Sequence, residues 1–557
     1  MISKFRFLVA ALFIFFITSS AIFAQQTFTH ADTLRGSITP QRAWWNVTYY
    51  DLHVAVHPAD STIDGYNNMT YRVTGPEKEM QIDLQQPMQV DSMLQNGQHL
   101  RYTRDGNAFF VKMPGQLKEH SLHTISIYYH GKPKVAKNPP WQGGFVWTHD
   151  SLGHRWIATA SQGIGASAWW PDKDQQKDEP DSMTMHITVP RPLIAISNGR
   201  LRDSTRHSNG TTTYTWHVSN PINNYDAVIY AGHYVNFTDT YHGEKGPLDL
   251  SYWVLKQHKK LAEKQFRQVK PMLKCYEHWF GPYPFYKDGY KLVEAPYLGM
   301  ENQSAIAYGN GFENGYHGED LSGTGWGKKW DFIIIHESAH EWWGNSVTAS
   351  DIADMWIHEG FASYAEALYT GCQYGEKAGK AYTRGTRKRI KNQRPVISHY
   401  GVHQEPPEDM YWKGANMLLT IREIINNDST FRHILRGIQK KFYHQTVNTQ
   451  QIKDYFTAHS GKNLDDVFDE YLRETEIPVL QYYIRNQRLH FRWKAAVNHF
   501  DMPLKVQLKK GKWTFIHPTS DRWKTVKLPL HSHRGFKVDK NFYIKTDSVT
   551  SVPTIKK

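Results

Sequence analysis

Alternating apolar and polar residues recur through the first half of the chain, and turn dipeptides such as Asn96-Gly97 separate the runs. Many short strands without a helical period predict a β-sandwich or a saddle-shaped sheet. We therefore expect an N-terminal β-rich domain over residues 25–240. The clearest alternating segments are 50–56, 69–73 and 186–189.

A helical period of apolar residues takes over in the middle of the chain. Residues 255–280 follow it and stop near Gly281, and residues 415–473 return to it. Between them, residues 291–295 have the pattern of a strand. We expect a mixed α/β domain over 241–475. Alternation then returns, which predicts a short C-terminal β domain over 476–557.

The first 24 residues have the pattern of a secretory signal peptide. Lys4 and Arg6 precede an apolar run, and small residues follow up to Ala24. The run is short for a membrane span, so an uncleaved anchor is the weaker alternative. We expect the leader to be cleaved, no stable membrane span to remain, and the mature protein to be secreted or periplasmic in a bacterial envelope.

Composition narrows the choice of function further. Hydrophobic residues make up 40% of the chain, which fits a globular fold, and the formal net charge is +13. The basic residues are spread out, and the densest run, 384–394, has the pattern of a solvated helix face, so we expect no nucleic-acid partner. Cys275 and Cys372 are the only cysteines. They leave open one disulfide or two buried thiols.

The strongest chemical pattern is His336-Glu337-Ser-Ala-His340. On a helix, residues four apart project from one face, so both imidazoles can reach one metal ion. Glu337 lies about 100° further round the helix. There it can act as a general base on an activated water without binding the metal. Gly344-Asn345 predicts the end of this helix.

A third ligand follows at Glu359, in a segment with helical spacing. Two imidazoles and one carboxylate are a known ligand set for catalytic zinc, with the fourth position left for water. The alternative is a helix with two hydrogen-bonded core histidines, but a buried His pair without a metal would be costly. We predict one Zn²⁺ per chain, held by His336, His340 and Glu359. Adjacent helix positions do not share a face, so we expect His358 at the surface.

Four segments together resemble the M1 family of gluzincin metallopeptidases, which includes aminopeptidase N and leukotriene A4 hydrolase. Two are the zinc-ligand segments described above, and the others resemble the exopeptidase motif and the segment with the family's catalytic tyrosine. Their order and spacing agree with the family. The segments are 298–302, 336–348, 356–362 and 411–414.

The resemblance implies a central thermolysin-like domain between the two β domains, and it assigns roles. Glu301 would bind the free α-amine of a peptide, within a substrate-binding segment that also contains Gly299, Met300 and Asn302. Tyr411 would donate to the developing oxyanion, a role that suits a tyrosine hydroxyl. Gln162, in a weaker match over 161–172, would help to bind the substrate's N-terminal end. Leu298 replaces a family glycine and His358 a family asparagine; neither change removes a catalytic group.

Together these patterns predict a zinc-dependent aminopeptidase that acts on peptides with a free N-terminus, with Glu337 and Tyr411 as catalytic residues. An endopeptidase with an open cleft is the main alternative. An epoxide hydrolase has little support, because nothing in the sequence indicates a lipid pocket. A catalytically inactive binding protein of the same fold would be expected to lack Glu337 or a zinc ligand. The sequence leaves the oligomeric state open.

Overall fold

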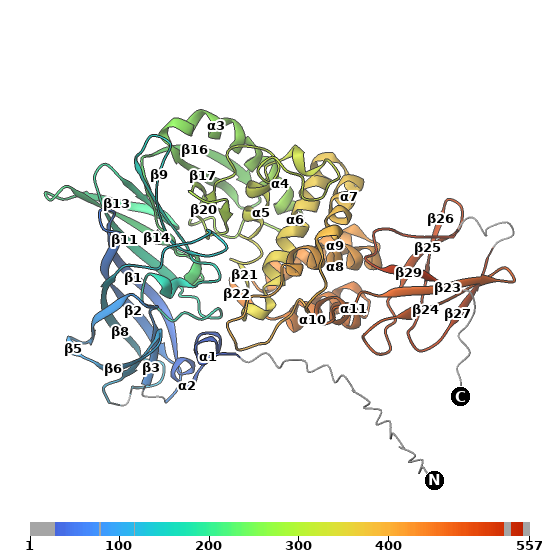
Figure 1. Ribbon diagram of the computed structural model, residues 1–557, viewed down its shortest axis with the longest axis horizontal. Helices are drawn as coiled ribbons and strands as arrows, with labels where there is room; N and C mark the ends of the chain where they lie inside the picture. The colour runs from blue at the N-terminus through green and yellow to red at the C-terminus, as the bar shows by residue number, and fades with distance from the viewer. Residues whose placement is uncertain (1–27, 77–78, 116, 529–535, 550–557) are drawn as a thin grey trace, which may run out of the picture.

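The computed structural model describes residues 28–76, 79–115, 117–528 and 536–549, so the predicted signal peptide lies outside the described residues. A β-rich region, a helical region around a small sheet and a second β region follow one another along the long axis of the molecule (Figure 1). The three-part architecture predicted from the sequence is confirmed.

An eight-stranded sheet forms the frame of the N-terminal region, in the order β13-β14-β11-β1-β2-β8-β4-β5. Alternate residues of β1 (Trp45–His57), such as Leu52 and Val54, are buried in the core while their neighbours face outward. β1 pairs antiparallel with β2 (Thr62–Val73) and parallel with β11 (Ser182–Pro190). The remaining strands are β4 (Gln89–Gln95), β5 (Gln98–His99), β8 (Leu122–Gly131), β13 (Arg200–Arg206) and β14 (Thr211–Val218).

Two smaller sheets complete this region, in the orders β12-β15-β10-β9 and β3-β7-β6. β10 ends two residues before Gln162, so this sheet leads the chain toward the central region. Their strands are β3 (Glu79–Asp83), β6 (Arg101–Asp105), β7 (Ala108–Lys112), β9 (Gly144–His149), β10 (Arg155–Ala160), β12 (Ile194–Ile196) and β15 (Tyr230–Gly232).

The central region combines a five-stranded sheet, in the order β16-β17-β18-β20-β19, with a set of helices. The predicted domain boundary after residue 240 falls inside β16, which belongs to this sheet. The predicted helical stretch 255–280 is divided, because β17 extends to Leu255 and two α-helices follow. The strands are β16 (Tyr234–Gly243), β17 (Gly246–Leu255), β18 (Tyr290–Glu294), β19 (Gly299–Met300) and β20 (Ile306–Tyr308).

The helices of the central region pack around α6, which is buried along most of its length and contacts α4, α5, α7 and α8. Cys275 of α4 and Cys372 of α6 form a disulfide, which settles the pairing that the sequence left open. The helices are α3 (Lys259–Gln265), α4 (Val269–Phe280), α5 (Phe332–Ala339), α6 (Trp356–Tyr374), α7 (Glu376–Thr386), α8 (Asp409–Ile425), α9 (Asp428–Lys441), α10 (Thr449–Ser460) and α11 (Asp465–Leu472).

The C-terminal β region consists of two small sheets, in the orders β27-β24-β23-β29 and β26-β25-β28. Its apolar residues, among them Leu480 and Trp493, belong to the same core cluster as the central helices. No helix among the described residues is long and apolar enough to cross a membrane. The strands are β23 (Val479–Arg485), β24 (Arg488–Lys494), β25 (Leu504–Lys509), β26 (Lys512–Ile516), β27 (Lys524–Lys527), β28 (Lys537–Val538) and β29 (Lys545–Ser548).

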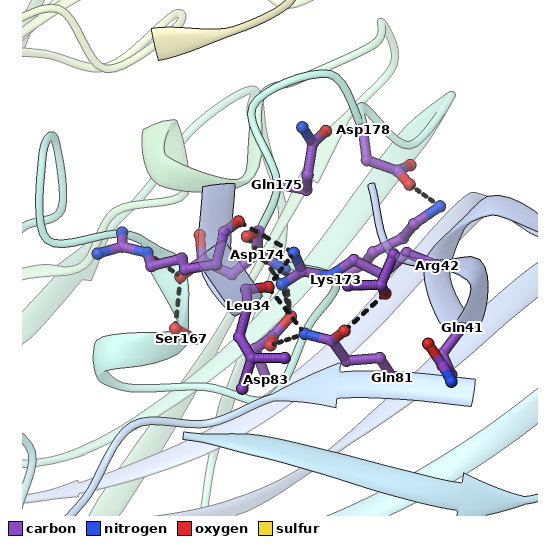
Figure 2. A network of polar contacts seen from close by, with 12 residues as sticks. Leu34, Gln41, Arg42, Gln81, Asp83, Ser167, Lys173, Asp174, Gln175 and Asp178 are labelled. Carbon is purple, nitrogen blue, oxygen red and sulfur yellow. Dashed lines mark hydrogen bonds and ion pairs between the residues drawn. The ribbon is translucent and has the colours of Figure 1, made fainter. Parts of the chain in front are cut away.

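A buried polar network ties the start of the described chain, α1 (His30–Gly36) and α2 (Pro40–Ala43), to the N-terminal sheets (Figure 2). The guanidinium of Arg42 is fully buried, pairs with Asp83 and donates to the carbonyl of Leu34 at 2.8 Å. The backbone N–H of His403 donates to the carbonyl of Asp32 at 3.0 Å. The N-terminal segment therefore connects the β-rich region with a loop of the central region.

Candidate metal centre and peptide-binding cleft

Three buried side chains from α5 and α6 converge on one point. The Nε2 atoms of His336 and His340 lie 3.4 Å apart, and each lies 3.4 Å from Oε2 of Glu359. That oxygen has no hydrogen-bond partner although it is buried. Ligand atoms bound at about 2.0–2.1 Å in a tetrahedron are separated by about 3.3–3.4 Å, so this donor set fits zinc.

The local sequence accounts for the placement of the two histidines. Asp331 caps the N-terminus of α5, and its Oδ1 accepts from the backbone N–H of Ile333 at 3.1 Å. The α-helix ends at Ala339, earlier than the predicted stop at Gly344-Asn345. His340 nevertheless keeps helical dihedrals as the C-cap residue, so the i, i+4 relationship to His336 is preserved.

Neighbouring groups determine which imidazole nitrogen faces the centre. Nδ1 of His336 donates to Oε1 of Glu366 at 2.7 Å, and Nδ1 of His340 donates to the carbonyl of Trp343 at 3.0 Å. Both Nε2 atoms are thus free to bind a metal. Tyr382 donates to the second oxygen of Glu366 at 2.6 Å. The sequence analysis missed Glu366, although it lies seven residues after Glu359, on the same face of α6.

Glu337 lines the cleft beside the metal ligands. Burial raises its pKa to about 7, against the opposing effect of the charges on His336 and His340. Gly299 lies directly beneath it, since a Cβ at that position would come within 2.8 Å of Oε1 of Glu337. A side chain at 299 would therefore displace this carboxylate or Ile333.

Glu301 is joined to the metal centre through Gln162. Nε2 of Gln162 donates to Oε1 of Glu301 at 2.6 Å and to Oε1 of Glu359 at 3.2 Å. The hydroxyl of Tyr225, which the sequence analysis did not identify, also donates to Glu301, at 3.1 Å. Burial raises the pKa of Glu301, and the negative charge of Glu359 adds to the effect.

Two residues of the predicted substrate-binding segment do not line the cleft. Met300 is buried in the core of the N-terminal region, and Asn302 donates to the hydroxyl of Tyr230 at 2.8 Å. Side-chain alternation in this extended segment explains the difference between Glu301, which lines the cleft, and Met300 and Asn302, which point away from it. Leu298, the departure from the family pattern, does line the cleft.

Tyr411 reaches the site from the first turn of α8, and its ring centroid lies 6.0 Å from that of His336. α6 and α8 approach closely where Gly360 faces Gly414, because a Cβ at 414 would come within 2.9 Å of Cα of Gly360. Tyr411 and Glu359 line the same cleft. Burial and the nearby carboxylates raise the pKa of Tyr411.

The prediction that His358 lies at the surface is wrong. Its side chain is fully buried, and Nε2 accepts a hydrogen bond from the backbone N–H of Ala349 at 2.8 Å. Burial lowers the pKa of His358 to about 3, which keeps the ring neutral. The helical argument failed because α6 is covered on more than one face, so leaving the ligand face does not expose a residue.

The cleft has a volume of about 590 Å³ and contains Glu337, Glu301, Tyr411 and the three metal-binding residues. Basic and acidic side chains line its outer part. They are Arg389, Lys391, Arg394, Glu405 and Glu408.

Two protein-family models match this chain. The model of the peptidase family M1 domain matches residues 265–471, and that of the peptidase M1 N-terminal domain matches residues 46–225. Leukotriene A-4 hydrolase from Xenopus laevis is 23% identical over 297 residues, which span 50% of this chain and 46% of that protein. The matched region is thus about half of the relative's length.

Solved structures share the fold. An M1 zinc metallopeptidase from Deinococcus radiodurans superposes with a TM-score of 0.66 and 22% identity, over 78% of this chain and 95% of the other. A mutant of that enzyme bound to a Tyr-Ser-Ala substrate gives a TM-score of 0.67 at the same identity, covering 78% and 96%. The fold and the two matched domains establish the class, a metallopeptidase architecture. The chain belongs to peptidase family M1.

Proposed function

We propose that this protein is a zinc-dependent aminopeptidase, which removes single residues from the N-terminus of peptides. The observation that carries the proposal is the bridge made by Gln162 between Glu301 and the metal ligand Glu359. It keeps a buried carboxylate beside the metal centre, within reach of the amine of a substrate's first residue.

In this proposal Glu337 and Tyr411 each have one catalytic role. Bound zinc would supply Lewis acidity, which polarises the scissile carbonyl and acidifies water. Glu337 would accept a proton from the attacking water and return it to the leaving nitrogen. The hydroxyl of Tyr411 would donate to the carbonyl oxygen as negative charge develops there.

Glu301 would set the point of cleavage. A carboxylate and an ammonium form a charge-assisted hydrogen bond, which fixes the first residue between Glu301 and the metal. Gln162 and Tyr225 already donate to one oxygen of this carboxylate and orient it. A peptide without a free amine would leave this buried carboxylate without a cationic partner, which is costly.

The test is mass spectrometry of the products from one decapeptide, supplied with a free and with an acetylated N-terminus. We expect stepwise loss of single residues from the free form only, and no cleavage by the Glu337→Gln variant. Internal cuts in both forms would support an open-cleft endopeptidase and reject the role of Glu301. A zinc-loaded protein that cleaves neither form would support an inactive binding protein.

We also propose that the mature protein works outside the cytoplasm, secreted or in the periplasm. The signal-peptide pattern of residues 1–24 and the disulfide between Cys275 and Cys372 support this location, because disulfides persist in oxidising compartments. Cell fractionation with N-terminal sequencing tests it. Protein found in the cytosol with residues 1–24 retained would refute the proposal.

A further inference from the structure

A second group of metal-binding side chain types lies on the outward face of the eight-stranded sheet, in the N-terminal region. Asp51 and His53 are two residues apart on β1, so their side chains leave the same face of the sheet. His186 on β11 is the direct register partner of His53. Parallel pairing thus gathers three side chains from segments about 130 residues apart.

The three ligand atoms are close together. Nε2 of His53 lies 3.3 Å and Nε2 of His186 lies 3.2 Å from the same oxygen, Oδ1 of Asp51. The side chains are 25–30% exposed, so ions from solvent can reach them while the surrounding strands hold them in place. Outside the cleft, no other group of this kind occurs among the described residues.

Further contacts orient each ligand in the manner of a metal site. Thr215 Oγ1 lies 3.0 Å from Nδ1 of His186, and Asn68 donates to the other oxygen of Asp51 at 3.1 Å. Tyr66 stacks on His53 with ring centroids 4.2 Å apart. These partners occupy the outward atoms of His186 and Asp51 and leave Nε2 and Oδ1 free for a metal ion.

This group differs from two other His–Asp pairs of the N-terminal region in the number of imidazoles that contact the aspartate. His57 contacts Asp64, and His130 lies 2.6 Å from Asp91, each with a single imidazole. At Asp51, two imidazoles share one carboxylate oxygen. Two nitrogens and one oxygen suit zinc and neighbouring divalent transition ions better than magnesium or calcium, which prefer oxygen ligands.

We propose that Asp51, His53 and His186 bind a divalent transition ion of the zinc type, separately from the centre in the cleft. Water would complete the coordination. The imidazoles are stacked with centroids 4.0 Å apart, so each ring must turn about its Cβ–Cγ bond to bring the shared ion into its plane. The ion would cross-link β1 to β11, which are distant in sequence.

The metal content of the full-length protein tests this proposal. After dialysis against micromolar free Zn²⁺, we expect two zinc ions per chain in the wild type and one in the His53→Gln and His186→Gln variants. The His57→Gln variant is the matched control, on the same sheet with its own aspartate, and should keep two. A wild type with one ion, or His53→Gln and His186→Gln variants that keep two, would overturn the proposal.

A fourth variant separates this site from the cleft. His336→Gln should bind one ion, and the double variant His336→Gln with His53→Gln should bind none. If His336→Gln binds no zinc while the wild type binds one, the outer site is refuted and the cleft site stands. Peptidase activity of His53→Gln equal to that of the wild type would show that its metal loss is not due to misfolding.

Discussion

Glu366 accepts a hydrogen bond from Nδ1 of His336 at 2.7 Å, with both side chains buried. A carboxylate in this position fixes the tautomer of the imidazole and raises the basicity of its other nitrogen. The second oxygen of Glu366 accepts from Tyr382, so the carboxylate itself is held in place. The chain therefore supports one of its zinc ligands from two helices, α6 and α7.

Weaker metal binding is the expected result of Glu366→Gln. The amide cannot replace the charge, and loss of such a partner typically lowers metal affinity about 10–100-fold. Competition with a chromophoric chelator measures the affinity, and excess zinc should restore activity. Tyr382→Phe is the milder control, since it removes one hydrogen bond and leaves the carboxylate. Unchanged affinity in Glu366→Gln would contradict the role.

The Glu337→Gln variant should lose catalysis and keep its metal. Glutamine cannot accept the proton of the attacking water, and general-base catalysis contributes about 10²–10⁴-fold to rate. Steady-state kinetics with a dipeptide amide gives kcat, and metal analysis gives the zinc content. A variant with near-normal kcat would show that another group is the base.

Glu301→Gln should weaken selection for a free N-terminus. A hydrogen bond to a charged group contributes about 1.5–3 kcal/mol, so kcat/KM for free peptides should fall by about 10–150-fold. The low rate on acetylated peptides should not fall with it. Tyr225→Phe keeps the carboxylate and removes one donor, so its effect should be smaller. Equal losses on free and acetylated peptides would indicate a general defect.

Replacing both cysteines of the Cys275–Cys372 disulfide with alanine should destabilise the central region. The bond closes a loop with a sequence separation of 97, and native disulfides typically contribute about 2–4 kcal/mol. Thermal unfolding with and without reductant measures the effect. The wild type should shift to lower temperature in reductant, and the double variant should not. Equal unfolding temperatures of the oxidised wild type and the variant would contradict the prediction.

Lys291 should make stability depend on pH above neutrality. Its ammonium lies between the carbonyls of Gly199 and Ser304, at 2.7 Å from each, and burial lowers its pKa to about 7. In the unfolded chain a lysine titrates near 10.4, so between these values the unfolded state binds more protons. The free energy of unfolding should therefore rise with pH between about 7 and 10.4. The contribution of Lys291 to this free energy should be lowest below pH 7.

The Lys291→Met variant removes this titration and keeps the apolar stem. The unfolding temperature of the wild type, measured relative to that of the variant, should increase from pH 7 to pH 10. Buffers with matched heats of ionisation ensure that both proteins unfold at the same pH as the temperature rises. A constant difference across this range would mean that the folded protein keeps the lysine charged throughout.

Periodicity and motif spacing were sufficient to predict the elements and most of the metal centre. Periodicity in the chain marks strands and helices, and the spacing of His336 and His340 places them on one helical face whatever surrounds that helix. Such relations depend on the geometry of one element, which a short segment defines. The spacing of Glu359 added the third ligand, and the resemblance of four segments to a family then gave Glu301 and Tyr411 their expected roles.

Which faces are covered and which distant segments meet became known only from the folded chain. His358 is buried because other elements pack against α6 on several sides. The periodicity of the sequence does not show how many elements pack against a helix. Glu301 meets Gln162 and Tyr225, and His53 meets His186, because the chain returns to the same place after long separations. Contacts of this kind depend on how complete layers pack, which no local pattern encodes.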